Sequence, residues 1–189
     1  MMDEEMLTFR LTDTQRDMVM SVRRLAQQRF KDRCKQWQDG TFPWENMHDL
    51  AEIGVLSMSV PKAYGGLELS VLDAALVLEE IAKVCYVTAM AALGEVGTQT
   101  RMIAHFAPEN IKQDILPRVA AGSAVLSICM TEPDAGTDLG RMRSKVSRQQ
   151  DELVLSGTKT LISRADVAEG FVVFARIRDT PGIDGIGGV

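Results

Sequence analysis

The sequence predicts an α+β fold, with an all-α helical domain over residues 1–122 followed by an antiparallel β domain over residues 123–189. Helical patterns fill the first part of the chain, and short runs of β-forming residues appear only after Gly122. Helices followed by strands are typical of segregated layers rather than of alternating βαβ units. In addition, no GxGxxG segment opens a βαβ unit, which disfavours a Rossmann fold.

Composition narrows the class of protein. The chain has 189 residues, of which 46% are hydrophobic and 25% charged, as in a soluble globular protein. The net charge is −5 and no basic block occurs, so neither nucleic acid nor an anionic membrane surface is an expected partner. No apolar run approaches the ~20 residues that span a bilayer.

The termini and cysteines indicate a compartment. Residues 1–6 are acidic and lack the basic-then-apolar order of a signal peptide. The cysteines are three, widely separated and without CxxC spacing, so we expect neither a disulfide framework nor a metal site. A cytoplasmic location fits these features best.

The first two helices are marked by their starts and stops. Residues 12–15 match a capping box, and apolar residues follow at helical intervals over residues 18–30. This helix is expected to end before Gly40. A shorter helix is predicted to begin at residues 42–44 and to end at Gly54.

A more apolar helical region comes next. Residues 55–60 form a short apolar run, and Ser70 with Asp73 resembles the start of another helix. Residues 72–82 are apolar nearly all round, and residues 89–93 continue in the same manner, which predicts helices buried on most sides.

Two further helices are predicted at residues 98–106 and 109–116, the second started by Pro108. His48 and His105 are the only histidines and have no companion ligands nearby in the sequence, so we interpret them as structural or surface residues.

Strands are predicted after Gly122 from runs of β-forming residues separated by turn residues. The predicted strands are residues 124–130, 143–148, 152–155, 160–162 and 171–177.

The turn that follows the first of these strands carries the most informative residues. Pro133 stops the strand because it has no N–H for a ladder bond. Thr131 places a hydroxyl just beyond the strand, Gly136 leaves the backbone open to a close approach, and Thr137 adds another polar group. We interpret this as a ligand-facing turn; the alternative is an ordinary turn, where Pro, Asp, Gly and Thr are common for conformational reasons alone.

Residues 130–138, Met-Thr-Glu-Pro-Asp-Ala-Gly-Thr-Asp, closely resemble the TEPxAGSD signature of the acyl-CoA dehydrogenase family. Residues 52–83, 107–122 and 153–176 resemble three further segments of that family in the right order. The resemblance implies FAD as cofactor and an acyl-CoA thioester as substrate. It also implies α,β-dehydrogenation to an enoyl-CoA, with hydride transfer to N5 of the flavin.

The resemblance assigns roles at matching positions. The Met130 backbone and the Thr131 hydroxyl would contact the pyrimidine side of the flavin. Gly136 and Thr137 would approach the pyrophosphate or the CoA ester. Ser163 stands in the place of the family's threonine and would bond near N5.

Two positions depart from the family pattern. Leu161 stands where an aromatic residue commonly stacks on the flavin, and Ile128 stands where tyrosine, phenylalanine or a small residue is common. The departures affect flavin tuning rather than flavin binding. The resemblance also predicts acyl-pocket residues in the apolar helical region, with core packing as the alternative for each: Met90, Leu93, Glu95 and Val96.

No catalytic residue is assigned in this chain. Glu79 and Glu80 are adjacent and so lie about 100° apart on a helix, which suits solvated or ion-paired groups rather than a catalytic pair. The resemblance covers only the front part of the family pattern. It implies that the catalytic glutamate lies in a missing C-terminal region, and that the β domain is truncated at Val189.

The resemblance further implies an electron-transfer flavoprotein as electron acceptor and a homo-oligomer, dimer or tetramer, as the assembly. Two alternatives remain open. One is an acyl-CoA oxidase or flavin monooxygenase of the same fold. The other is a non-catalytic short paralogue or fragment that lacks the catalytic glutamate.

Overall fold

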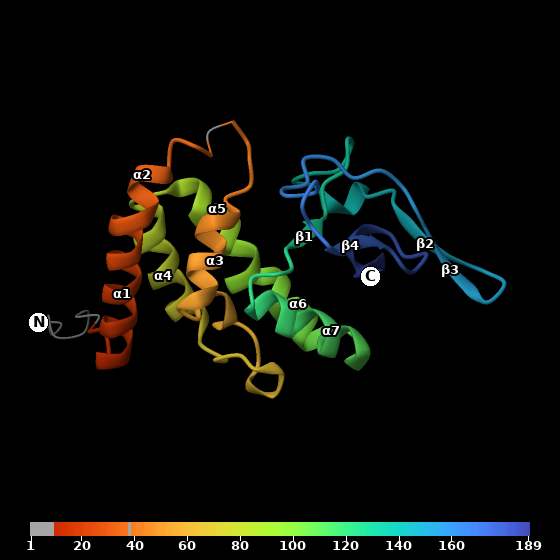
Figure 1. Ribbon diagram of the computed structural model, residues 1–189. Coiled ribbons are helices and arrows are strands. Elements are labelled where there is room, and N and C mark those ends of the chain that lie inside the picture. Colours follow the sequence, from red (N-terminus) through yellow and green to blue (C-terminus); the bar gives the residue numbers. More distant parts are fainter. Residues whose placement is uncertain (1–9, 38) are drawn as a thin grey trace, which may run out of the picture.

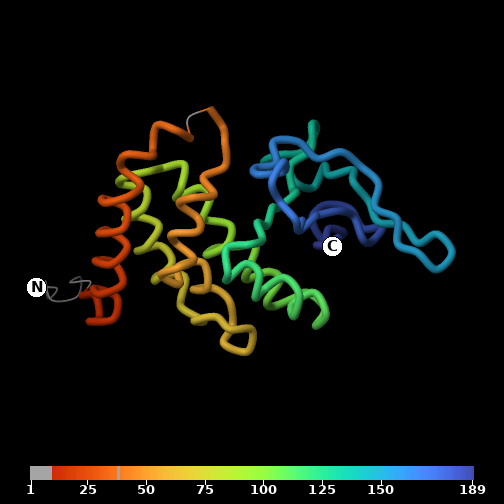
Figure 2. Tube along the Cα trace, in the orientation of Figure 1, coloured from red at the N-terminus to blue at the C-terminus, as the bar shows by residue number. Residues whose placement is uncertain are grey.

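The computed structural model describes residues 10–37 and 39–189, and it places helices at one end and a small sheet at the other (Figure 1). The chain passes from the helical part to the sheet after α7 (Figure 2). The predicted order of helices before strands is therefore confirmed. The acidic segment at residues 1–6 lies outside the described residues. No helix in the described part of the chain is long and apolar enough to cross a membrane.

Capping side chains begin the helices where the sequence predicts. The Thr12 hydroxyl accepts a hydrogen bond from the Gln15 N–H, and the Ser70 hydroxyl accepts one from the Asp73 N–H. The helices are α1 (Asp13–Leu25), α2 (Lys31–Arg33), α3 (Trp44–Glu52), α4 (Val71–Ala82), α5 (Tyr86–Val96), α6 (Thr98–Phe106) and α7 (Glu109–Ala120).

Three details of the helical part could be placed only by the structure. A π-helical turn, Ala26–Phe30, connects α1 to α2. The apolar run at residues 55–60 begins with a 3₁₀ turn, Val55–Ser57, after Gly54 has ended α3 in the left-handed region. Helix α7 continues past its predicted end at residue 116 and includes Pro117, although a proline inside a helix removes one hydrogen bond and crowds the carbonyl four residues before it.

The sheet is mixed. Its strands are β1 (Leu126–Cys129), β2 (Lys145–Gln149), β3 (Glu152–Ser156), β4 (Gly170–Arg176) and β5 (Ile186–Gly188). Their order is β1-β4-β2-β3, with β5 also paired to β4. The β2–β3 and β4–β5 pairs are antiparallel, but β1 and β4 are parallel. The expectation of a purely antiparallel sheet is corrected, because the β2–β3 hairpin lies within the connection that returns the chain to run alongside β1.

The strand predicted at residues 160–162 does not form. Leu161 has a φ of 57° and Arg164 a φ of 64°, both in the left-handed region, which a strand cannot contain. The Thr160 N–H instead donates to the Thr131 carbonyl over 3.0 Å. The segment therefore passes beside the turn that follows β1.

Two apolar clusters position the site. The larger lies among α1, α3, α4 and α5 and includes the fully buried side chains of Phe30, Leu50 and Ile81. The smaller joins Val60 to Leu116 of α7 and Leu126 of β1. Burial of each such side chain stabilises the fold by about 1.5–3 kcal/mol. The smaller cluster therefore fixes the start of β1 against the helices.

Candidate functional site

A buried carboxylate shapes the turn after β1. Glu132 is only 6% exposed. It accepts hydrogen bonds from the N–H groups of Arg143 (2.6 Å) and Ser144 (2.9 Å) and from Lys159 Nζ (2.9 Å). Lys159 Nζ also donates to the Met130 carbonyl over 3.0 Å. The Thr-Glu-Pro sequence is thereby held on both sides of Thr131.

The charge on Glu132 is stabilised by these donors. Burial alone would raise the pKa of the carboxyl, but the hydrogen bonds from Ser144, Arg143 and Lys159 outweigh it and bring the pKa down from 4.5 to about 2. Glu132 is therefore an ionised structural group at neutral pH, and it does not serve as a proton acceptor.

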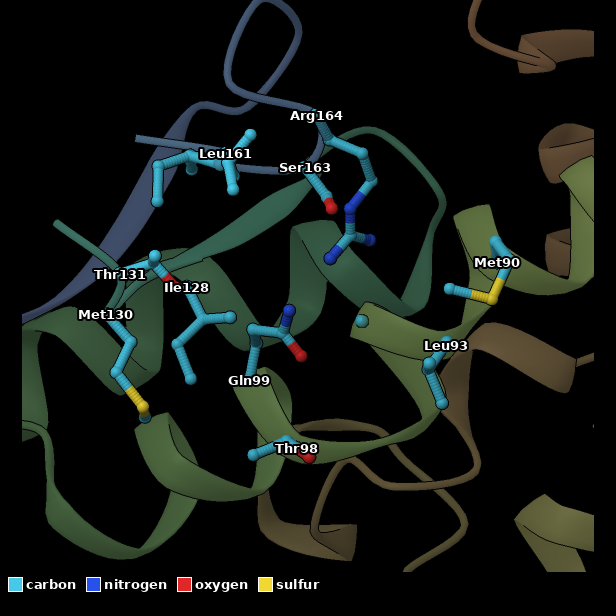
Figure 3. A pocket seen from close by; sticks show the side chains of 12 residues that line it. Met90, Leu93, Thr98, Gln99, Ile128, Met130, Thr131, Leu161, Ser163 and Arg164 are labelled. Atoms are coloured by element: carbon cyan, nitrogen blue, oxygen red, sulfur yellow. The ribbon is translucent and has the colours of Figure 1, made fainter. Parts of the chain in front are cut away.

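A pocket of ≈ 340 Å³ opens between this turn and the helices (Figure 3). Its walls come from α5, from the start of α6, from β1 with the turn beyond it, and from the 161–164 segment. The lining is mostly apolar, with hydroxyl, amide and guanidinium groups interspersed: Met90, Leu93, Gly94, Thr98, Gln99, Ile128, Met130, Thr131, Leu161, Ile162, Ser163 and Arg164.

A second, more polar cavity of ≈ 540 Å³ adjoins the first. Residues 131–138 form most of its wall, and Thr131 and Leu161 line both cavities. In the described part of the chain, the N–H groups of Gly136, Thr137 and Asp138 have no hydrogen-bond partner. Consecutive free N–H groups in a turn can bind anionic oxygens.

All six predicted cofactor residues line one or both of these cavities. Met130, Thr131 and Ser163 line the first, while Gly136 and Thr137 line the second. Leu161 is 86% exposed. It therefore presents a large apolar side chain at the boundary of the cavities, where the sequence predicts contact with the flavin.

The predicted acyl-pocket residues divide into two pairs. Met90 and Leu93 are 44% and 42% exposed and line the first cavity. Glu95 and Val96 are fully buried and line neither of these two cavities, so the structure places them in the core beside the site. The 3.6-residue period of α5 turns position 95 to the opposite side of the helix from positions 90 and 93, which face the cavity.

Glu95 has a partner that the sequence did not indicate. Arg164 Nη1 lies 2.9 Å from Glu95 Oε2 and 2.9 Å from the Ala91 carbonyl. The Leu126 N–H also donates to Glu95 Oε1 over 3.0 Å. Burial raises the pKa of Glu95 to about 7, and the charge of Arg164 opposes that rise.

Arg164 is the main functional candidate that the sequence prediction missed. The signal in the sequence was the residue type at position 164. The family segment that resembles residues 153–176 has asparagine directly after the residue that corresponds to Ser163, whereas this chain has arginine there. A long cationic side chain at the end of an apolar pocket differs chemically from an amide. Gln99 and Thr98 also line the first cavity, and no motif pointed to them.

The cavity residues fit a flavin nucleotide. The Thr131 and Ser163 hydroxyls make no hydrogen bond within the described residues, so both are available to a ligand. A Cβ built at Gly136 has no atom within 4 Å, so the chain leaves space beside the free N–H groups. Apolar walls with a few free donors suit the flavin ring, and the free turn N–H groups suit a pyrophosphate.

Comparison with known proteins agrees with this geometry. Residues 12–123 match the model of the acyl-CoA dehydrogenase N-terminal domain, and residues 127–188 match that of the middle domain. The chain is 33% identical to the 3-sulfinopropanoyl-CoA desulfinase of Variovorax paradoxus, over 94% of this chain and 45% of that protein. It is 35% identical to the cyclohex-1-ene-1-carbonyl-CoA dehydrogenase of Geobacter metallireducens, over 93% of this chain and 47% of that protein.

Among solved structures, a glutaryl-CoA dehydrogenase from Mycobacterium smegmatis in complex with FADH2 is similar to this chain. The TM-score is 0.84 at 27% identity, over 94% of this chain and 45% of that one. The chain thus spans about half the length of the relatives it matches. Both family models match in the expected order and the fold agrees, so the chain belongs to the acyl-CoA dehydrogenase family.

Proposed function

We propose that this chain provides the flavin-facing and acyl-facing walls of an FAD-dependent acyl-CoA dehydrogenase. The observation that carries the proposal is the pair of adjoining cavities that share Thr131 and Leu161. One cavity is largely apolar with free hydroxyls, and the other is bounded by free turn N–H groups. The reaction would remove the α proton and the β hydride of an acyl-CoA thioester.

The bound flavin would supply the hydride acceptor. The Thr131 hydroxyl would donate to the pyrimidine side of the ring, and the Ser163 hydroxyl would lie near N5. The Met130 carbonyl already accepts from Lys159 and is therefore engaged within the chain. Leu161 would cover one face of the ring through its exposed side chain.

Substrate and cofactor phosphates would meet the second cavity. Gly136 and Thr137 would bind the pyrophosphate or approach the CoA ester with their free N–H groups. Met90 and Leu93 would contact the acyl chain from α5. Glu95 would influence the acyl pocket only indirectly, through its ion pair with Arg164.

The remaining expectations concern the assembly. We propose an electron-transfer flavoprotein as electron acceptor, a homo-oligomer as the working form, and a cytoplasmic location. The catalytic base is not assigned to a residue of this chain. Among the described residues, the buried carboxylates are all engaged in ion pairs: Asp49, Glu80, Glu95 and Glu132.

Flavin absorbance of the purified complete gene product tests the proposal. We expect bound FAD, bleaching of the oxidised flavin on anaerobic addition of a short acyl-CoA, and recovery of the colour when an electron-transfer flavoprotein is added. Rapid recovery with oxygen alone would favour an oxidase or monooxygenase of the same fold. A colourless protein, or a yellow one that no acyl-CoA bleaches, would overturn the proposed function.

A further inference from the structure

Arg164 enters the acyl-facing cavity from an unusual direction. Its backbone is left-handed, and its side chain extends toward α5, where Nη1 contacts Glu95 and the Ala91 carbonyl. Gly94 makes this path open, because a Cβ at that position would collide with both terminal nitrogens of the guanidinium. Figure 3 shows the guanidinium reaching into the space between Ser163 and Gln99.

The guanidinium has donors to spare. Arginine carries five N–H donors in a fixed planar fork. The hydrogen bonds of Arg164 within the described residues all come from Nη1. Its Nε is fully enclosed by the protein and has no hydrogen-bond partner. Within the described residues Nη2 has no partner either, but it is not fully enclosed, so it is the donor that a ligand in the cavity can reach. An acceptor on a bound ligand would satisfy this donor.

The charge of Arg164 is balanced inside the protein when Glu95 is ionised. Glu95 is fully buried and lies 2.9 Å from Nη1. The other side chains that line the cavity are uncharged, so nothing else in its wall alters this balance. The cavity thus offers hydrogen-bond donors without net charge, which favours a neutral acceptor over a carboxylate.

We infer that Arg164 makes this cavity select acyl groups that carry an uncharged oxygen, such as a keto, hydroxyl or ether group, over plain alkyl chains. The inference rests on the proposed function, because it takes the α5 side of the cavity, lined by Met90 and Leu93, as the acyl side and leaves the Thr131 and Ser163 side to the flavin ring. Met90, Leu93 and Ile128 contact the carbon chain, and the N–H groups of Arg164 Nη2 bind the oxygen. Arg164 is thereby a specificity-determining residue.

Three five-carbon thioesters test the inference by calorimetric titration of the purified FAD-bound protein. Pentanoyl-CoA is the plain chain, levulinoyl-CoA adds a neutral keto oxygen, and glutaryl-CoA adds a carboxylate. Titrations at about pH 8 favour the ionised form of Glu95, because burial raises its pKa to about 7. We expect levulinoyl-CoA to bind about tenfold or more tightly than pentanoyl-CoA, as a hydrogen bond to a charged donor allows.

Two variants test separately the hydrogen-bond donors of Arg164 and the balance of its charge. Arg164→Met with Glu95→Gln removes the donors without leaving a buried unpaired carboxylate, and the preference for levulinoyl-CoA should disappear. Glu95→Gln alone leaves the Arg164 charge unbalanced, and glutaryl-CoA should then gain relative to levulinoyl-CoA. Thermal melting of each variant confirms that it is folded; if the double variant is not, the wild-type titrations and Glu95→Gln decide.

Each contrary result has its own meaning. Equal binding of pentanoyl- and levulinoyl-CoA by the wild type overturns the inference but leaves the proposed function intact. Tighter binding of glutaryl-CoA than of levulinoyl-CoA overturns the neutral-acceptor class, as does a keto preference that survives in the double variant. Failure of all three thioesters to bind overturns the proposed function together with this inference.

Discussion

At the scale of single residues, the site depends on groups whose own hydrogen bonds are already complete. Glu132 and Lys159 satisfy each other and the turn backbone, so Thr131 is positioned before any ligand arrives. Gly136 has the opposite character, since its surroundings are open and its N–H is free. The rigid residues place the turn, and the open ones remain for the ligand.

Gly136→Val tests whether that open space belongs to the cofactor. No atom lies within 4 Å of a Cβ at this position, and its φ is not in the left-handed range, so we expect the variant to fold normally. With FAD in place the added side chain would obstruct the backbone's approach, and the purified variant should lose most of its flavin absorbance.

Glu79→Gln is the control, because Glu79 is exposed on α4 and should leave the colour unchanged. Retention of full flavin content and turnover in Gly136→Val would show that the phosphate-facing turn has been placed wrongly.

At the scale of elements, α1 and α4 are joined by a partly buried ion pair. Glu80 of α4 is 6% exposed in its side chain and binds Arg23 Nε of α1 over 2.7 Å and Lys83 Nζ over 2.7 Å. The side chain of the adjacent Glu79 is 61% exposed and, among the described residues, pairs only with Lys83. Adjacent residues are about 100° apart around the helix axis, so Glu80 faces α1 as a structural carboxylate while Glu79 faces solvent.

Glu80→Gln should cost about 1–3 kcal/mol of unfolding free energy near neutral pH, because it weakens a charged hydrogen-bond network. Arg23 lowers the pKa of Glu80 from 4.5 to about 2, with Lys83 assisting and burial opposing. A lowered pKa gives stability that is present above the ordinary pKa and is lost as pH falls toward the folded value.

The difference between wild type and Glu80→Gln should therefore be largest near neutral pH and shrink between about pH 5 and pH 2. Urea unfolding at several pH values measures it. Glu79→Gln is the matched control and should change stability by less than about 0.5 kcal/mol. Equal effects of the two substitutions would contradict the assigned ion pair.

At the scale of the whole molecule, the helical part and the sheet are joined by apolar packing and by ion pairs. The cluster of Val60, Leu116 and Leu126 lies at the junction, and Arg118 of α7 pairs with Glu169 just before β4. At the far side of β4, β5 pairs with β4 only, among the strands that the structure describes. Its outer edge is therefore available to another strand.

This edge predicts concentration-dependent association of the 189-residue chain. Val189 and Val173 exchange both ladder bonds, so the N–H of the preceding Gly188 points away from β4. Gly188→Pro should remove that outward donor, keep the inner ladder and weaken association. Sedimentation velocity over a range of concentrations measures the effect, with Gly188→Ala as the control. A wild-type chain that stays monomeric throughout would refute the prediction.

The sequence by itself determined the order of helices and strands, the capped starts of α1 and α4, and the turn that contains Thr131 and Gly136. These features depend on residues close together in the chain, where periodicity, capping and turn chemistry act locally. The family resemblance rests on the same local segments, and for that reason it could be read before the fold was known.

Only the tertiary structure decided the parallel pairing of β1 with β4, the left-handed backbone at Leu161 and Arg164, and the Arg164–Glu95 pair. Residues 95 and 164 are far apart in sequence, and their contact depends on Gly94 leaving room and on the sheet docking against α5. No local pattern encodes such a contact, because its energy arises from burial and charge compensation that exist only once the layers have packed.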